Sequence, residues 1–184
     1  MAAPRRRWAA EILHFWFHRL RPKDWFRPGA DVDAMLRERF ERDLSMLGNR
    51  PAHEFLGDPQ TARAAVLLFD QVPRNVYRGS ARAFAFDPLA RAITRAALAR
   101  GFDTNLRGAE RQFFAMPLMH SEAIGDQLWS LHYFPLLGPR YGAPFARSHY
   151  RMIARFGRFP HRNEVLGRPS TEAEKRAVAQ GFAW

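Results

Sequence analysis

The chain has 184 residues, and its 47% hydrophobic and 14% aromatic content is enough to form the core of one domain. Its formal net charge is +11 at pH 7, and only Lys23 and Lys175 are lysines, so the basic residues are almost all arginine. Cysteine is absent, which excludes disulfide scaffolds, thiolate nucleophiles and zinc–thiolate sites. No apolar run approaches the roughly 20 residues that span a bilayer. We therefore expect a soluble, cytoplasmic protein with no membrane segment.

The N-terminal third shows the apolar spacing of two helices. Apolar residues recur every three or four positions from Trp8 onward, which predicts a helix to about Arg19. A loop over 21–29, rich in proline and charge, is expected to follow. A second apolar stripe predicts a helix from about Asp31 that stops at Gly48, since glycine is favoured just after a helix.

Two Asp–Pro pairs mark the next helix starts. Asp58 and Asp87 are each predicted to be an N-cap, and each is followed by a proline, which is favoured at the first position of a helix. The helix after Asp58 is predicted to end near Pro73, because proline breaks a helix interior. The helix after Asp87 is predicted to close at Gly101.

The second half predicts further helices and no strand. The expected segments are 107–116, a helix capped by Ser121 and ended by Pro135 and Gly138, a helix from Pro144 to Gly157, and a tail helix with a Thr171–Glu174 capping box. No stretch alternates in the way that strands do. Many short helices with short loops predict an all-α domain of antiparallel helix pairs over residues 1–184.

Two segments echo each other in this helical pattern. PRNVYRG at 73–79 and PHRNEVLGR at 160–168 each follow a helix and contain proline, arginine and asparagine before a closing arginine and glycine. The echo is too short to prove a duplication. No 34-residue self-similarity of the tetratricopeptide type accompanies it.

Four motifs together resemble a known family. EILHFWF at 11–17, DQVPRNVYRGSARAFAFD at 70–87, PLMHSE at 117–122 and RFGRFPHRNEVLGR at 155–168 are similar, in order and spacing, to the bacterial family catalogued as domain of unknown function 924. The resemblance implies a tetratricopeptide-like superhelical arrangement and assigns no activity. His14 stands where the family often has an acid. The family's motif residues carry over as Asp70, Gln71, Arg74, Asn75, His120, Glu122, Arg155, Arg158, His161, Arg162 and Asn163.

The arginine-rich segment 155–168 is the strongest candidate for a binding site. Guanidinium groups match phosphate and carboxylate oxygens, so several of them from one turn would hold an anion. The alternative is that these arginines cap helices and pair with Asp70, Glu122 or Glu164 to fasten the loop. The residues concerned are Arg155, Arg158, His161, Arg162, Asn163 and Arg168.

The DQVPRN segment is a second candidate. Asp70, Gln71, Arg74 and Asn75 follow an apolar helix, and a turn at Pro73 would direct them toward a shared site. Alternatively, Asp70 and Arg74 pair at a spacing of four. In that structural interpretation, Asn75 only adopts a left-handed backbone conformation.

His161 is the best candidate for acid–base chemistry, because histidine titrates near neutrality. Neighbouring arginines would favour its neutral form and so a base role, with Asp70 or Glu122 as the partner carboxylate. His120 and Glu122 are two residues apart and share no helical face, so we expect neither a metal site nor a cofactor.

Together these features predict that the chain binds an anionic small molecule or an acidic peptide terminus in an Arg/His pocket. Segments 70–75, 120–122 and 155–168 would form that pocket. Two alternatives stay open: an enzyme that uses His161, and a structural protein whose polar motifs only stabilise the fold. The aromatic residues have core spacing, which argues against specific nucleic-acid binding. The sequence does not constrain the oligomeric state.

Overall fold

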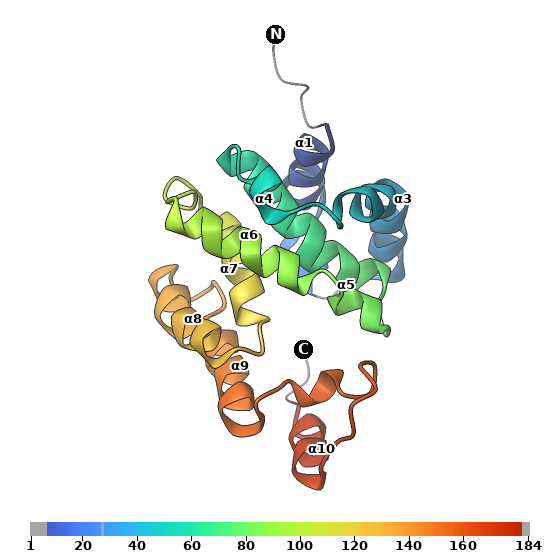
Figure 1. The fold of residues 1–184 in the computed structure, drawn as a ribbon, viewed down its shortest axis with the longest axis vertical. Coiled ribbons are helices and arrows are strands. Elements are labelled where there is room, and N and C mark those ends of the chain that lie inside the picture. Colours follow the sequence, from blue (N-terminus) through green and yellow to red (C-terminus); the bar gives the residue numbers. More distant parts are fainter. Residues whose placement is uncertain (1–6, 27, 182–184) are drawn as a thin grey trace. The chain divides into compact units, whose positions relative to one another are not determined.

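The computed structural model describes residues 7–26 and 28–181, and this part of the chain is helical with no strand (Figure 1). The all-α prediction is therefore confirmed. The chain divides into two compact units, Met1–Arg78 with Arg82–Asn105 and Gly79–Ala81 with Leu106–Trp184, called the first and second unit below. The predictions of one domain and of a tetratricopeptide-like arrangement stay predictions. No described helix is long and apolar enough to cross a membrane.

The first unit is formed by helices that bury their apolar faces against one another. Helix α1 packs against α4, α3 against α5, and α4 against α6. Buried aromatic side chains fill the core, with Phe15 edge-on to Phe40 at 5.8 Å and Phe55 to Phe69 at 5.2 Å between ring centroids. Its helices are α1 (Arg7–His14), α2 (Pro22–Phe26), α3 (Ala30–Leu47), α4 (Pro59–Val66), α5 (Val72–Val76) and α6 (Asp87–Ala99).

Two π-helical turns extend helices of the first unit. The turn η1 (Phe15–Arg19) continues α1, and η3 (Leu67–Gln71) connects α4 to α5. The predicted helix end near Pro73 is wrong, since Pro73 lies in the first turn of α5. A missing N–H costs little there. The predicted loop over 21–29 is also partly wrong, because α2 forms within it.

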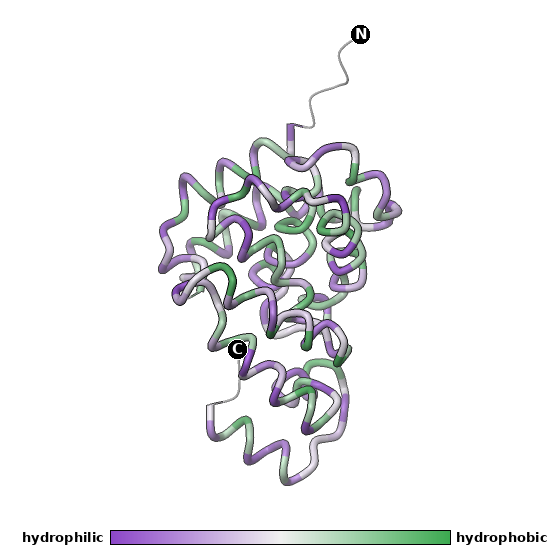
Figure 2. The backbone as a smooth tube through the Cα atoms, turned by 90° about the vertical axis from the view of Figure 1, so that its left-hand side faces the viewer, coloured by the Kyte–Doolittle hydropathy of each residue, from purple (hydrophilic) through white to green (hydrophobic). Residues whose placement is uncertain are grey.

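The second unit consists of three packed helices and a short C-terminal helix. Helix α7 (Gly108–Met119) packs against α8 (Ile124–Leu136), which packs against α9 (Ala143–Phe156). Gly157 ends α9 with φ of 68°, as predicted for a residue in the left-handed region. The short helix η5 (Pro160–Arg162) contacts α10 (Glu172–Ala179). Apolar positions recur along each of these helices and form the cores (Figure 2).

Two helix starts show how capping works in this unit. The capping box predicted for α10 is confirmed, with Thr171 and Glu174 bonded to each other's backbone N–H. Ser121 does not cap α8 as predicted: the N-cap is Ala123, and the Ser121 hydroxyl accepts from the Ala123 N–H at 3.1 Å. The remaining short helices are η2 (Ala52–Phe55) and η4 (Ala81–Phe84).

Candidate functional site

The segment from Gly157 to Arg168 is held to the start of the α8 region by one carboxylate. Glu122 accepts two hydrogen bonds from the Arg168 guanidinium, at 2.8 and 3.0 Å, and a third from the Phe159 backbone N–H at 2.8 Å. Burial raises the pKa of Glu122, but the bonds from Arg168 and Phe159 outweigh it and lower the pKa below its usual value. Glu122 is thus an ionised clamp for this segment.

The same segment is also closed by its own side chains. Asn163 is fully buried, accepts from Arg168 Nε at 3.0 Å and donates to Ser170 at 3.1 Å. Arg158 donates two hydrogen bonds to Glu174, at 2.7 and 3.0 Å. These bonds lower the pKa of Glu174 to about 2. Most N–H donors of Arg158 and Arg168 are therefore used in hydrogen bonds that stabilise the segment from Gly157 to Arg168.

Three histidines gather beside this loop. The rings of His120 and His149 lie 6.2 Å apart between centroids, and His149 is edge-on to Phe159 at 5.2 Å. The ring of His161 also packs near Phe159, with 5.6 Å between the two ring centroids. The Arg162 guanidinium stands 4.4 Å from the centre of the same Phe159 ring. Phe159 is thus the common support of an Arg/His cluster, defined as His120, His149, His161 and Arg162.

The cluster is buried and carries a positive field. His149 and Arg162 are 4% and 6% exposed, and His161 is half-buried. Burial lowers the pKa of His149 to about 3, and His120 and Arg162 contribute further. Burial and then Arg162 lower the pKa of His161 to about 4, against the opposing effect of Glu122. Both imidazoles are neutral at pH 7, as the sequence predicted for His161.

The remaining arginine of the segment lies outside this network. Arg155 is exposed in the last turn of α9, where its guanidinium stands 4.9 Å from the centre of the Phe156 ring. Ring stacking keeps the side chain along the surface of its own helix. Arg155 therefore contributes charge to the surface beside α9.

In the first unit, Arg74 is the centre of the DQVPRN segment. Its guanidinium binds both oxygens of Asp87 at 2.9 Å and lies 3.2 Å from the carboxylate of Asp70, which is fully buried. It also donates to the backbone carbonyl of Asp70. Burial lowers the pKa of Arg74, but the two carboxylates outweigh it and raise the pKa overall. The predicted pairing of Asp70 with Arg74 at a spacing of four is present.

Gln71 and Asn75 are the buried amides of this segment, and both are hydrogen-bonded within it. Gln71 donates to the Asp70 carboxylate, and Asn75 donates to the Gln71 carbonyl at 2.9 Å. Asn75 accepts from Arg78, which forms a two-bond ion pair with Asp33 at 3.0 Å. Asn75 lies in α5 and no described non-glycine residue has positive φ. The alternative of a left-handed Asn75 is therefore wrong, and its amide instead bridges two turns.

The structure brings together part of the predicted site within each unit. Asp70, Gln71, Arg74 and Asn75 form one network, and His120, Glu122, Arg162, Asn163 and Arg168 belong to another with His161. A single pocket that includes both networks stays a prediction, as does the role of every site residue. No set of three or more His, Asp or Glu side chains in the described ranges is arranged to hold a metal ion.

Sequence reasoning missed three partners in these networks. Asp87 was expected as a helix cap, but it is the first residue of α6 and neutralises Arg74. Glu174 both caps α10 and pairs with Arg158. Phe159, 0% exposed, supports the histidines. Of these three residues, only Glu174 has a role that the sequence indicates, as the acid of a capping box. The contacts of Asp87 and Phe159 join residues that no local sequence pattern connects.

Known proteins extend the similarity over nearly the whole chain without adding an activity. A family described as bacterial protein of unknown function (DUF924) matches residues 12–181. A solved structure of a protein of unknown function, ATU0120 from Agrobacterium tumefaciens, is similar with a TM-score of 0.88 and 36% identity. The match covers 94% of this chain and 97% of that one. No curated protein matches the chain.

Proposed function

Because the chain belongs to the bacterial DUF924 family, whose function is unknown, we propose a function from the site itself: binding of an anionic small molecule or an acidic peptide terminus by the Arg/His cluster of the second unit. The observation that supports this proposal most is the position of Arg162, a residue only 6% exposed, beside two imidazoles that stay neutral at pH 7. We propose that the protein does this in the cytoplasm.

The chemistry of the cluster favours an anion. A buried guanidinium interacts more strongly with an anion than an exposed one, because water screens it less. A neutral imidazole offers one N–H donor without adding like charge. The Nδ1–H of His149 is donated to the Phe145 carbonyl at 2.8 Å, so the other nitrogen of that ring is an acceptor and His149 brings no donor to an anion. His161, half-buried, is the member through which a ligand would reach the cluster.

In this proposal the other arginines have a supporting role. Arg158 and Arg168 fasten the loop through Glu174 and Glu122, so that Phe159 and the short helix η5 hold Arg162 in place. A rigid support of this kind lowers the entropy cost of binding. The structural alternative accounts for Arg158 and Arg168, whereas it gives no reason to gather three histidines around a buried cation.

The enzyme alternative is weaker on one physical ground. A general base works best when its pKa is near the working pH, and the pKa of His161 is about 4. His161 would therefore hold a proton poorly at pH 7. A bound anion would raise that pKa and make the residue more basic, so acid–base chemistry would depend on anion binding first.

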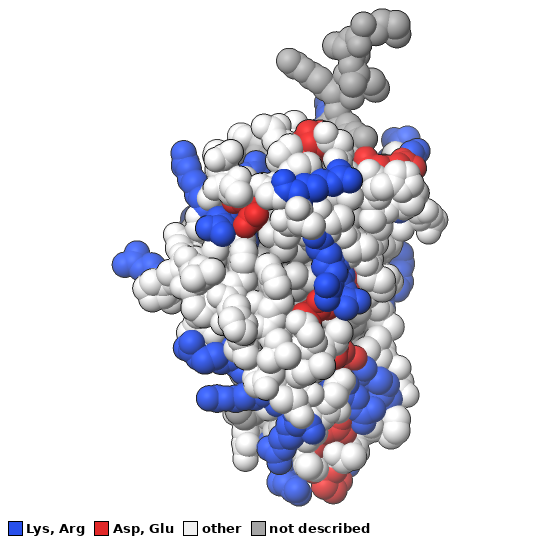
Figure 3. Space-filling view, turned by 60° about the vertical axis from the view of Figure 1, so that its left-hand side comes forward, with Lys and Arg blue, Asp and Glu red and all other residues white. Residues whose placement is uncertain are grey.

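The basic side chains on the face drawn in Figure 3 do not favour nucleic acid as the ligand of either unit. Figure 3 shows the basic side chains of one face in separate groups, with acidic side chains next to several of them. Nucleic-acid sites instead present a continuous basic stripe that follows the backbone. This observation agrees with ligand binding at a local cluster.

Thermal unfolding in the presence of defined anions tests the proposal. We expect phosphate, citrate or a peptide that ends in aspartate to raise the melting temperature at constant ionic strength. At 100 times Kd the stabilisation is about 2.7 kcal/mol, which corresponds to a rise of about 5–10 °C for a chain of this size. Absence of stabilisation by all three probes contradicts the proposal.

Two substitutions separate a specific site from general charge. Arg162→Gln should abolish the stabilisation, and far-UV circular dichroism should show an intact fold. Arg147→Gln is the matched control, because Arg147 is exposed on α9 outside the cluster, and it should respond as the wild type does. Equal responses in both variants would show that the anions act on net charge alone.

A further inference from the structure

The π-helical turn η1 of the first unit forms one wall of a cavity that the Arg/His cluster does not involve. In this turn the Leu20 N–H donates to the Phe15 carbonyl at 3.1 Å, five residues back. Such a bond is the i to i+5 pattern of a π-helix. His14 and Leu20 flank the turn, and Phe15 and Arg19 are its first and last residues. All four residues line the cavity.

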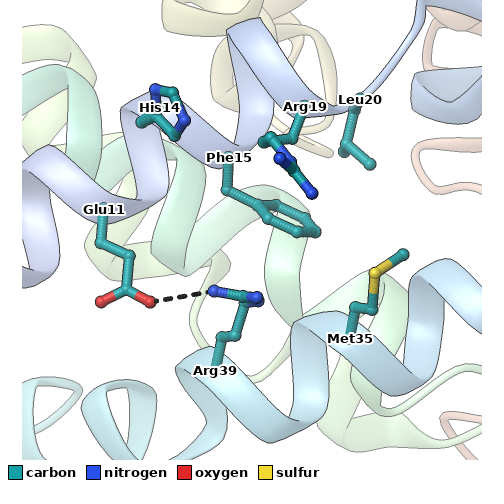
Figure 4. A pocket seen from close by; sticks show the side chains of 7 residues that line it. All are labelled: Glu11, His14, Phe15, Arg19, Leu20, Met35 and Arg39. Atoms are coloured by element: carbon teal, nitrogen blue, oxygen red, sulfur yellow. Dashed lines mark hydrogen bonds and ion pairs between the residues drawn. The ribbon is translucent and has the colours of Figure 1, made fainter.

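Helix α3 supplies the opposite wall. Met35 and Arg39 are four residues apart and so share one face of α3. Glu11, from α1, completes the lining. Figure 4 shows Arg19 and Arg39 extending from these two walls toward the Phe15 ring. The cavity has a volume of about 360 Å³, within the range of small-molecule sites.

The charges on the lining are only partly balanced. Arg39 lies 3.5 Å from Glu11, and both side chains are well exposed, so the pair is weak. Arg39 also stands 5.4 Å from the centre of the Phe15 ring. Among the described residues, no acidic side chain forms an ion pair with Arg19. The lining thus has two guanidinium groups against one carboxylate.

Apart from His14, the rest of the lining is apolar. Phe15 and Leu20 are 5% and 8% exposed, and they form a fixed hydrophobic floor. Met35 is 36% exposed and has a flexible thioether that adapts to a ligand's shape. An inorganic anion would leave this half of the cavity unused. A ligand with both an anionic head and a hydrocarbon body would use all of it.

We propose that this cavity binds a small organic carboxylate, whose carboxylate lies between Arg19 and Arg39 and whose hydrocarbon body contacts Phe15 and Met35. The site is separate from the proposed function of the second unit. A guanidinium recognises a carboxylate through paired hydrogen bonds, and the aromatic floor supplies apolar contact. Benzoate and hexanoate are suitable probes, and benzamide is the neutral match for benzoate.

Methionine-methyl NMR gives a direct test on the full chain. The protein has six methionines, so a sample labelled with ¹³C at the methionine methyls gives a simple spectrum, in which Met35→Leu identifies the reporter. Benzoate should shift the Met35 signal in a saturable way and leave Met152, in the second unit, unshifted. Benzamide should bind at least about tenfold more weakly. An unshifted Met35 signal, or equal binding of benzamide, overturns the proposal.

Substitutions then identify which charged side chains bind the carboxylate of benzoate. Arg19→Gln should weaken benzoate binding about tenfold, since each lost charge-assisted pair has an effect of that order. His14→Asp should weaken it too, because it adds an anion to the lining. Arg42→Gln, on α3 but outside the cavity lining, should bind as the wild type does. If Arg42→Gln weakens binding as much as Arg19→Gln, or phosphate binds as tightly as benzoate, the carboxylate site is refuted.

Discussion

The two segments that echo each other in sequence use the same local device in different electrostatic settings. In the first unit, the side-chain carbonyl of Asn75 accepts from Arg78; in the second, that of Asn163 accepts from Arg168. Each asparagine thereby joins its turn to a closing arginine. In both cases the arginine also forms a two-bond ion pair with a carboxylate from elsewhere in its unit.

The difference lies in what surrounds the device. In the first unit Arg74 lies against two carboxylates, Asp70 and Asp87, so the cation is compensated within hydrogen-bond distance. In the second unit Arg162 lies beside neutral histidines, whose pKa values it lowers, and its charge also acts on Glu122. A guanidinium bonded directly to two carboxylates fastens a fold, whereas a guanidinium beside neutral imidazoles is the better place for an added anion. We therefore expect the first network to be structural and the second to be responsive.

The largest expected effect is on stability in the first unit. Arg74→Met leaves the fully buried Asp70 without its guanidinium partner, so the free energy of unfolding should fall by about 3–5 kcal/mol. Urea denaturation measures the change. Arg78→Met is the control, because its side chain is 55% exposed and should cost less than about 1 kcal/mol. Similar losses for both would show that Arg74 is not the centre of the network.

A smaller loss is expected at the clamp of the second unit. Glu122→Gln keeps the shape of the side chain but removes the charge that accepts from Arg168 and the Phe159 N–H. The free energy of unfolding should fall by about 1–3 kcal/mol. In a double-mutant cycle with Arg168→Gln the two losses should not add. Additive losses would show that the pair contributes nothing jointly.

The similarity of segments 73–79 and 160–168 predicts that their asparagines contribute equally to the free energy of unfolding. Asn75→Ala and Asn163→Ala each remove one donor and one acceptor that are bonded in the fold. Each should cost about 1–2 kcal/mol in urea denaturation. If one substitution is neutral, the two segments share a sequence pattern without sharing a structural role.

The smallest effect is a pH dependence confined to the second unit. The pKa of His149 is lowered to about 3 from 6.5, so between these values the unfolded chain takes a proton that the folded chain excludes. Stability then rises with pH through this window and falls on acidification. From pH 7 to 5.5 the loss should be about 1 kcal/mol. His149→Asn should remove that part of the slope; an unchanged slope would contradict a neutral His149.

Sequence patterns predicted the helices well where local rules dominate. The start of α6 at Asp87 and the αL end of α9 at Gly157 follow from local backbone preferences, and α3 stops before Gly48 as predicted. The π-helical turn Leu67–Gln71 was missed, because its i to i+5 bonding has no residue signature. For the same reason the sequence wrongly predicts that the helix ends near Pro73, where α5 in fact begins.

The sequence predicted which residues belong to the site, but it did not predict which residues they contact. Motif density indicated Arg74, Glu122, His161 and Arg168, yet their partners depend on long-range contacts. Arg168 meets Glu122 across 46 residues of chain, and no pattern in one sequence specifies such a pair. The cavity next to Phe15 was missed as well, since its two walls come from separate helices.

The most direct test of the central proposal is the pKa of His161, followed by NMR of its imidazole with and without sulfate at matched ionic strength. Sulfate keeps its double negative charge over pH 4–8. If the Arg/His cluster binds an anion, the anion favours the imidazolium form, and the pKa of His161 should rise from about 4 by about one unit or more. A pKa that is the same in sulfate and in chloride would contradict the account.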